Sequence, residues 1–295
     1  MGAEQSAAER DSNIIIEQQL RSRLGAIEQA ANADVLSYFG PMYTPADDQI
    51  KDAVEALTGR KGGLMVILET GGGYIGIVER IARIFRHHYK RVDFVVPSYA
   101  MSAGTVLVMS GDAIFMDYAS VLGPIDPQVE RSGDLVPALG YLQQYERLIA
   151  KSAAGTLTTA EMAYLVQRFD PAELYRYEQE RELSIALLED WLVKYKFKNW
   201  KVTETKQTPV TATMRKERAK TIGEQLNETD RWHSHGRGIP MEVLRRDLKL
   251  LIEDFGSDPQ LGPPMHDYYH LLRDYQMRRG HDLFVIHTRE GYVGF

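Results

Sequence analysis

The stretch 63-GLMVILETGGGYIGIVERIARIFRHH-88 contains three kinds of structural signal in succession. Gly63 to Leu68 is a continuous apolar run, which is typical of a strand buried on both faces of a parallel sheet. Three glycines follow, and Tyr74 to His88 then carries apolar residues at helical spacing. A strand, a tight turn and a helix in this order predict an α/β fold with a largely parallel sheet.

The same alternation continues on both sides of this stretch. Further strands are expected at Asp34–Phe39, Arg91–Val96 and Ala113–Met116, with a helix from Pro45 to Gly59. The segment from Ser6 to Asn32 is expected to form an amphipathic helix that packs on the domain or on a neighbouring subunit.

Helix formers dominate from Ala138 to about Lys198, with interruptions at 155-GTLT-158 and at Asp170-Pro171. This pattern predicts a helical, partly inserted region over about 138–215. We therefore expect an N-terminal helix at 1–33, a main domain at 34–256 and a C-terminal extension at 257–295, which includes a strand-like run at 283–286.

The composition narrows the classes of function. The chain has 295 residues, a net charge of −6 and no cysteine. The acidic balance argues against a general affinity for nucleic acid, and the lack of cysteine excludes disulfides, thiolate metal sites and cysteine nucleophiles. No apolar run reaches the roughly 18 residues of a membrane span. We expect a cytoplasmic protein without metal or cofactor, although Met1–Ser6 matches the short myristoylation pattern.

Two turns carry residues that suit catalysis. Gly71–Gly73 exposes backbone N–H groups, which can hold a phosphate or the oxyanion of an acyl-transfer intermediate. In 97-PSYAMSAGTVLVMS-110, Ser102 precedes an apolar helix, where a serine is either an N-cap or a nucleophile at a strand-to-helix turn. Because turns after successive parallel strands open at one sheet edge, we expect both turns to face one crevice.

A nucleophilic serine needs a proton acceptor. No histidine occurs between His88 and His233, and Lys151 is the first lysine that follows Ser102. Lys151 lies in an apolar stretch before a small-residue turn, where burial would lower the pKa of its ammonium. Lys151 is therefore a candidate base, and a lysine whose ammonium stays in water is the plain alternative.

The segments 67-ILETGGGYIGIVERIARIF-85 and 99-YAMSAGTVLVMSGDAIFMDYASVLGPIDPQ-128 together resemble the serine dehydrogenase proteinase family. This family belongs to the wider group of the Clp protease proteolytic subunit and signal peptide peptidase A. The resemblance covers roughly 34–255 and is strongest over 64–128. It implies a crotonase/Clp-protease-like fold, with flanking helices and a helical arm, and a homo-oligomeric serine peptidase that cleaves proteins or peptides.

The resemblance also implies roles for single residues. Ser102 stands at the nucleophile position, and the Gly72 and Ala103 amides stand where the oxyanion is held. The Clp-type histidine would be expected near Val121 to Asp126, where this chain has Leu122-Gly123-Pro124-Ile125. A Clp-type triad is therefore not expected.

Signal peptide peptidases use a serine and a lysine instead. Lys151-Ser152 followed by 158-TTAE-161 resembles their lysine segment, so the resemblance implies a Ser102–Lys151 dyad. The edge 121-VLGPIDP-127 is either a place where an extended substrate adds as a strand or an ordinary proline-rich turn. The residues expected at the substrate edge are Gly73, Leu122 and Gly123.

An α/β-hydrolase is an alternative enzyme class. It would use Ala100–Gly104 as its elbow and His233, His235 or His270 as its base. His233 and His235 lie in 231-RWHSHGRGIP-240, which we interpret as a structural turn and not as a metal site, because no third ligand is evident.

Two non-hydrolytic functions remain as alternatives. A crotonase relative that binds an acyl-CoA in the same crevice would need no nucleophilic serine. A catalytically silent oligomeric scaffold would use the long helices from Tyr141 to Trp200 as its functional surface.

Overall fold

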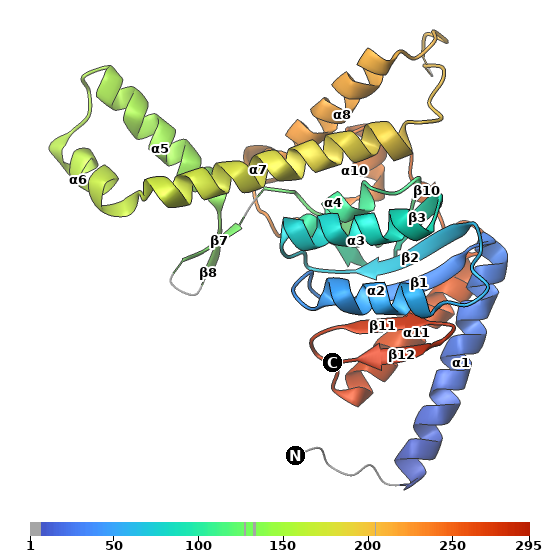
Figure 1. Ribbon diagram of the computed structural model, residues 1–295. Helices are drawn as coiled ribbons and strands as arrows, with labels where there is room; N and C mark the ends of the chain where they lie inside the picture. The colour runs from blue at the N-terminus through green and yellow to red at the C-terminus, as the bar shows by residue number, and fades with distance from the viewer. Residues whose placement is uncertain (1–6, 127, 132–133, 204) are drawn as a thin grey trace.

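A seven-stranded sheet forms the centre of the protein in the computed structural model, which describes residues 7–126, 128–131, 134–203 and 205–295 (Figure 1). The strand order is β10-β5-β3-β2-β1-β11-β12. The first five of these strands are parallel, and β11 and β12 are antiparallel to their neighbours. The predicted α/β class with a largely parallel sheet is confirmed. The strands are β1 Asp34–Phe39, β2 Gly63–Glu69, β3 Arg91–Val96, β5 Ala113–Met116, β10 Glu253–Asp254, β11 Val285–Thr288 and β12 Gly291–Gly294.

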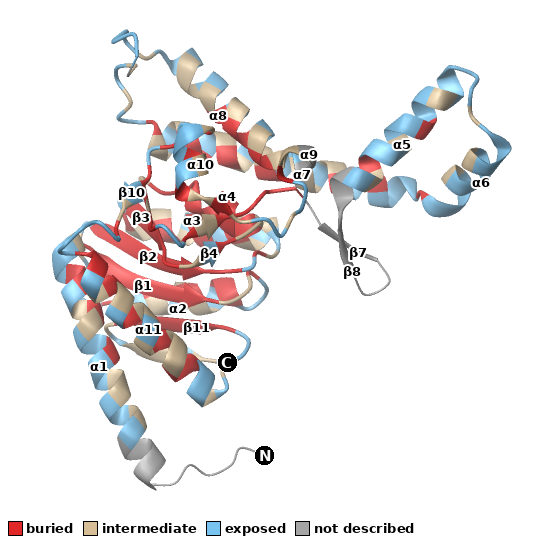
Figure 2. Cartoon of the chain, turned by 180° about the vertical axis from the view of Figure 1, so that it is seen from behind, coloured by how far each residue is buried: buried red, intermediate tan, exposed pale blue. Residues whose placement is uncertain are grey.

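The side chains of the central strands divide between two cores. In β1, Leu36 and Tyr38 belong to one core, whereas Val35 and Phe39 belong to the other. This division follows from the two-residue period of a strand, and it explains why β1 and β2 are buried along their whole length. The apolar run of the sequence is thus a strand with a helical layer on each face (Figure 2).

The helices form those two layers. One core contains side chains of α2 (Ala46–Ala56), α3 (Ile75–His88), α4 (Ala103–Val108), α8 (Ala212–Asn227) and α10 (Met241–Arg246). The other is covered by α1 (Ala7–Ala31) and α11 (Gly262–Arg279), which lie side by side. The predicted N-terminal helix therefore packs on the domain, and the Met1–Ser6 motif lies outside the described residues.

A helical arm leaves this body, as the resemblance implies (Figure 1). It contains a small core of its own, built from Leu142, Leu148, Phe169, Leu174 and Tyr177. The predicted interruptions mark its corners, since Thr158 forms a capping box and Asp170 caps the next helix before Pro171. Its elements are the hairpin β7 (Gln128–Arg131) and β8 (Asp134–Pro137), α5 (Ala138–Ala153), α6 (Thr159–Arg168) and α7 (Pro171–Trp191), and α7 returns to the body.

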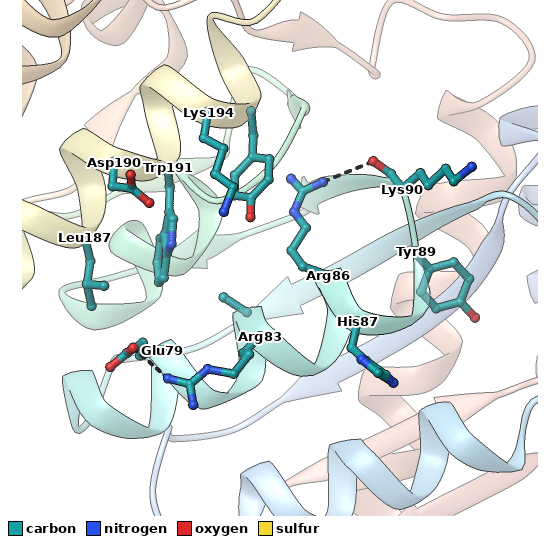
Figure 3. Close-up of a pocket in the computed structure, with 12 residues that line it drawn as sticks. Glu79, Arg83, Arg86, His87, Tyr89, Lys90, Leu187, Asp190, Trp191 and Lys194 are labelled. Atoms are coloured by element: carbon teal, nitrogen blue, oxygen red, sulfur yellow. Dashed lines mark hydrogen bonds and ion pairs between the residues drawn. The ribbon is translucent and has the colours of Figure 1, made fainter.

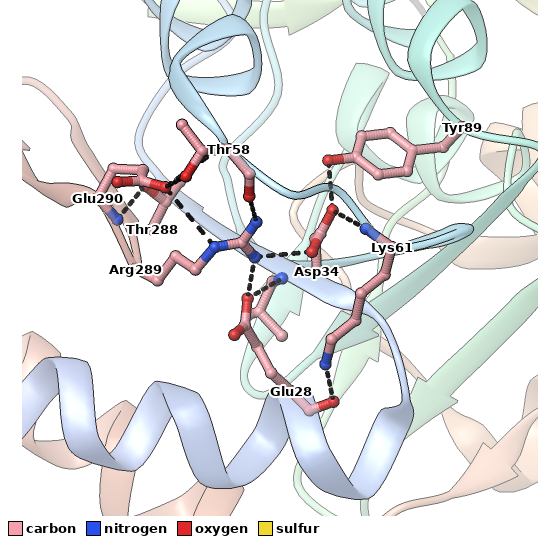
Figure 4. Close-up of polar contacts among 9 residues, drawn as sticks. Glu28, Asp34, Thr58, Lys61, Tyr89, Thr288, Arg289 and Glu290 are labelled. Carbon is pink, nitrogen blue, oxygen red and sulfur yellow. Dashed lines mark hydrogen bonds and ion pairs between the residues drawn. The ribbon is translucent and has the colours of Figure 1, made fainter.

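The C-terminal residues are part of the main sheet, since β11 pairs with β1. Arg289, in the turn after β11, binds the buried carboxylate of Asp34 at 2.7 Å and Glu28 at 2.8 Å (Figure 4). Lys61 and Tyr89 also donate hydrogen bonds to Asp34. This cluster joins the chain end to α1, to β1 and to the loop before β2.

Three short strands lie beside the turn that contains Ser102. β4 (Tyr99–Ala100), β6 (Val121–Leu122) and β9 (Ile239–Pro240) form a second sheet in the order β4-β6-β9. The remaining elements are η1 (Leu192–Lys196), a π-helix, and α9 (Thr229–Trp232). None of the described helices is both long and apolar enough to span a bilayer.

Candidate active site

Ser102 lies in the turn between β4 and α4 and has an unusual backbone conformation. Its φ of 53° and ψ of −123° lie outside the regions that non-glycine residues normally adopt. Although Ser102 is the residue before α4, its side chain makes no capping hydrogen bond. Ser102 is therefore not a simple N-cap, which was one of the two roles that its sequence position allowed. The strained turn presents a half-buried hydroxyl.

The glycine turn lies directly against this serine. Gly72 has a φ of 105°, and a Cβ atom built on it would be 2.8 Å from the Cβ of Ser102. The backbone joins the two turns, because the Thr70 amide donates to the Tyr99 carbonyl at 3.1 Å and the Met101 amide to the Thr70 carbonyl at 2.9 Å. The predicted meeting of the two turns is confirmed.

The two predicted oxyanion donors differ in their hydrogen bonding. Within the described residues, the Ala103 amide makes no hydrogen bond and is available to a ligand. The Gly72 amide instead donates to the buried hydroxyl of Thr70 at 3.0 Å. An oxyanion would have to share or replace that bond, which sequence reasoning did not foresee.

The predicted substrate edge is already paired in this structure. β6 is the central strand of its sheet, and Leu122 lies between Ala100 and Ile239. The Gly123 amide donates to Ala100 at 3.2 Å and to Thr105 Oγ1 at 2.9 Å. An added peptide strand would have to displace such bonds or pair with another part of the backbone.

Lys151 lies near the end of α5, on the arm. Its ammonium contacts Glu161 at 2.5 Å, and together with Thr158 it lowers the pKa of the Glu161 carboxyl to about 2. In the described part of the chain no hydrogen bond connects Lys151 with Ser102, and α5 extends away from the body that holds α4 (Figure 1). A single chain does not bring the predicted dyad together.

A histidine–carboxylate pair includes a residue that follows β6, the strand that pairs with β4. His235 Nδ1 lies 2.9 Å from Asp126 Oδ1, and the Asp126 side chain is fully buried. Leu122 pairs with Ile239 in antiparallel register, and the same register, continued by four residues, sets Asp126 opposite His235. Because β6 is parallel to β4, Asp126 follows β6 at the edge where Ser102 follows β4.

Sequence reasoning considered His235 only as a structural turn residue or as a hydrolase base, and it missed the carboxylate partner. The signal was an aspartate after the small strand at Val121–Leu122, but nothing local relates it to a histidine 109 residues away. The other histidines proposed for the hydrolase alternative, His233 and His270, are exposed.

A groove lies elsewhere, between α3 and the end of α7 with η1 (Figure 3). It has a volume of about 660 Å³ and is lined by Arg83, Arg86, Trp191 and Tyr195, among others. Arg83 pairs with Glu79 at 2.8 Å, and Arg86 pairs with the half-buried Asp112 at 2.8 Å. None of the predicted site residues lines this groove, so it is not the candidate active site.

A metal site would need several donor side chains close together. Among the described residues, no group of three or more His, Asp or Glu side chains is arranged to hold a metal ion.

Residues 39–167 match the sequence model of the ClpP-like SDH-type serine proteinases. The resemblance to the serine dehydrogenase proteinase family is confirmed over these residues. The segment of this chain that matches the family model includes the glycine turn, Ser102 and Lys151, and it ends before His235.

Curated relatives and solved structures extend the comparison. Uncharacterized proteins MJ1495 and MJ0137 of Methanocaldococcus jannaschii are 33% and 35% identical over 98 and 132 residues. These matches cover 33% and 42% of this chain, and the chain spans only 32% and 45% of the relatives' own lengths.

Three solved structures are similar at a lower level. Two are of the 1510-N membrane-bound stomatin-specific protease. Its serine-to-alanine mutant is 13% identical, with a TM-score of 0.42, and the match covers 74% of this chain and 77% of that one. Its lysine-to-alanine mutant in complex with a substrate peptide is 14% identical, with a TM-score of 0.42, and the match covers 74% of this chain and 73% of that one. The third is ClpP1 from Listeria monocytogenes, at 14% identity and a TM-score of 0.29, covering 54% and 90%.

Proposed function

We propose that this protein is a serine peptidase in which the hydroxyl of Ser102 attacks a peptide carbonyl. The observation that carries the proposal is the contact between the two turns: Ser102 has a positive φ, caps nothing and lies against the Gly72 backbone. The family whose model matches residues 39–167 is one of serine proteinases, which supports the same reaction class.

The amides of Ala103 and Gly72 would hold the oxyanion that forms after the attack. Each such donor contributes about 3 kcal/mol to transition-state stabilisation in comparable sites. The Ala103 amide is available, whereas the Gly72 amide would exchange the Thr70 hydroxyl for the oxyanion. The amine then leaves, and water hydrolyses the acyl-enzyme.

Lys151 is the proposed base, and it would reach Ser102 from the arm of a second copy. The arm exposes apolar side chains that its small core does not use, including Met162, Tyr164 and Val166. Burying them against another subunit would be favourable and would form the homo-oligomer that the resemblance implies. Lys151 would have to leave Glu161 to accept a proton.

The His235–Asp126 pair is a second candidate base, and one observation favours it: both residues belong to the body that carries Ser102. A carboxylate on Nδ1 orients the ring so that Nε2 can accept a proton. The Ser102 hydroxyl makes no hydrogen bond to a described residue, and catalytic hydrogen bonds often tighten only when substrate binds. The cytoplasmic location that the composition predicts is part of the proposal.

The first test is intact mass after incubation with a serine-directed phosphonylating probe. Wild type should gain one adduct, and Ser102→Ala should gain none. Loss of the adduct in Lys151→Met with retention in His235→Gln identifies the lysine, and the reverse result identifies the histidine.

A mixing experiment tests whether the lysine acts between copies. Ser102→Ala protein retains Lys151, and Lys151→Met protein retains Ser102. Co-refolding the two should restore the adduct on the Lys151→Met chains if the lysine comes from a neighbouring copy. No adduct on wild type with several probe classes would favour the acyl-CoA-binding or scaffold alternatives.

A further inference from the structure

Two tyrosines are exposed beside the glycine turn. Tyr43 is 47% and Tyr74 is 67% exposed, and their ring centroids are 5.2 Å apart at an interplanar angle of 48°. Large aromatic side chains are usually buried for most of their area, because exposing their faces to water is unfavourable. The pair therefore presents unused apolar surface at one place.

The backbone attaches this pair to the oxyanion turn. The Met42 amide donates to the Gly72 carbonyl at 2.8 Å, and the Tyr74 amide donates to the Met42 carbonyl at 3.1 Å. A Cβ on Gly73 would lie 2.4 Å from that same Met42 carbonyl oxygen, so the two segments are in direct contact. Tyr43 follows Met42 and Tyr74 follows Gly73, so one set of contacts positions both rings.

The pair is also close to the nucleophile. Gly72 touches Ser102, and the Cα of Tyr74 is two residues further along, within about 7.6 Å of the Gly72 Cα. A substrate residue within a few positions of the scissile bond would therefore lie beside these rings.

Two carboxylates near Tyr43 in the sequence share one cation. Asp47 and Asp48 stand in the first turn of α2, soon after Tyr43, and Arg80 of α3 binds them at 2.5 and 2.6 Å. The three groups carry a net charge of −1, so the case for an aromatic substrate side chain depends on the exposed ring faces and not on charge.

We propose that Tyr43 and Tyr74 form a subsite for an aromatic side chain of the peptide substrate. Ring-to-ring contact contributes beyond simple area burial and would distinguish phenylalanine from alanine at that substrate position. This inference rests on the proposed peptidase function and adds to it the class of residue that is preferred.

The test compares two peptides that are identical except for phenylalanine or alanine at one position, scanned on both sides of the cleaved bond. Tyr74→Ala and Tyr43→Ala should each lower kcat/KM for the best phenylalanine peptide about three- to tenfold and leave the alanine peptide within about twofold. Tyr74→Phe should retain the preference. Tyr175→Ala, at a tyrosine on α7 that is 63% exposed, is the matched control and should change neither value.

Two further readouts separate this inference from the proposed function. Ser102 labelling by a small phosphonate should be unchanged in the tyrosine variants, and its absence in wild type would count against the peptidase. Equilibrium binding of the same peptides to Ser102→Ala protein needs no turnover, and the phenylalanine peptide should bind more tightly only while both tyrosines are present. Equal losses for both peptides, or none for either, would overturn the subsite.

Discussion

Gly72 lies so close to Ser102 that no side chain on Gly72 would fit between the two residues. A Cβ at this position would come within 2.8 Å of the Ser102 Cβ and 3.3 Å of the Ala103 nitrogen. The glycine turn and the turn at Ser102 are thus in contact only because Gly72 has no side chain.

Gly72→Ala should abolish Ser102 labelling while the fold persists. The added methyl would push the two turns apart, and φ at 105° is strained for any L-residue. Displacing an oxyanion donor costs about 100-fold or more in rate, so labelling should fall by at least that factor. Gly76→Ala is the control, because its Cβ would meet nothing within 4 Å. Normal labelling of Gly72→Ala would show that this contact is not needed.

Arg289→Met should destabilise the protein by about 3 kcal/mol. It leaves the fully buried Asp34 and the adjacent Glu28 without their shared cation, and an unpaired buried charge is costly. Urea unfolding at neutral pH measures the change in the free energy of unfolding. Arg278→Met removes an exposed pair with Asp274 and should change little. Equal effects of the two variants would mean that the cluster of Figure 4 contributes no special stability.

The free energy of unfolding should fall as the pH drops below about 6.5. Burial lowers the pKa of His287 to about 3 in the folded protein, so only the unfolded chain takes up a proton between these values. The contribution of His287 is fully present above its unfolded pKa and decreases toward pH 3. At pH 5 the loss would be about 2 kcal/mol. His287→Gln should flatten this part of the profile, whereas substituting the exposed His270 should not.

Val166→Asp should dissociate the proposed homo-oligomer. Val166 is 74% exposed on the arm, and a charge there would oppose burial against a second copy. Sedimentation velocity should show a smaller species, while Leu251→Asp, at an equally exposed apolar residue of the body, should leave the size unchanged. If the dissociated variant still labels at Ser102 at the wild-type rate, Lys151 does not act from another subunit and the His235–Asp126 pair is favoured.

Elements with a strong local pattern were predictable. The helix expected from Tyr74 to His88 is α3, and the strand expected at Asp34–Phe39 is β1 with identical bounds. Their apolar spacing and flanking glycines act over a few residues, which is the range in which backbone preferences and burial patterns are set. The strand-like run near the C-terminus was also visible, although β11 begins two residues later than expected.

Long-range pairings were not predictable in the same way. Nothing local indicates that β11 adds antiparallel to β1, which makes residues 257–295 part of the main core. Likewise, β6 is paired on both sides, so the edge expected at Leu122 and Gly123 is occupied. Such contacts depend on how distant segments pack, and the residues within a short stretch of sequence do not indicate which distant segment they will contact.

The sequence by itself determined the parallel α/β core, the glycine turn and the serine at a strand-to-helix turn, because strand period, helix period and turn chemistry are local. Only the tertiary structure decided that Ser102 caps nothing, that the Gly72 amide is bonded to Thr70, and that Asp126 meets His235 while Lys151 pairs with Glu161 on the arm. These relationships join residues from different elements, and their geometry follows from the packing of the sheets and helices and not from any local preference.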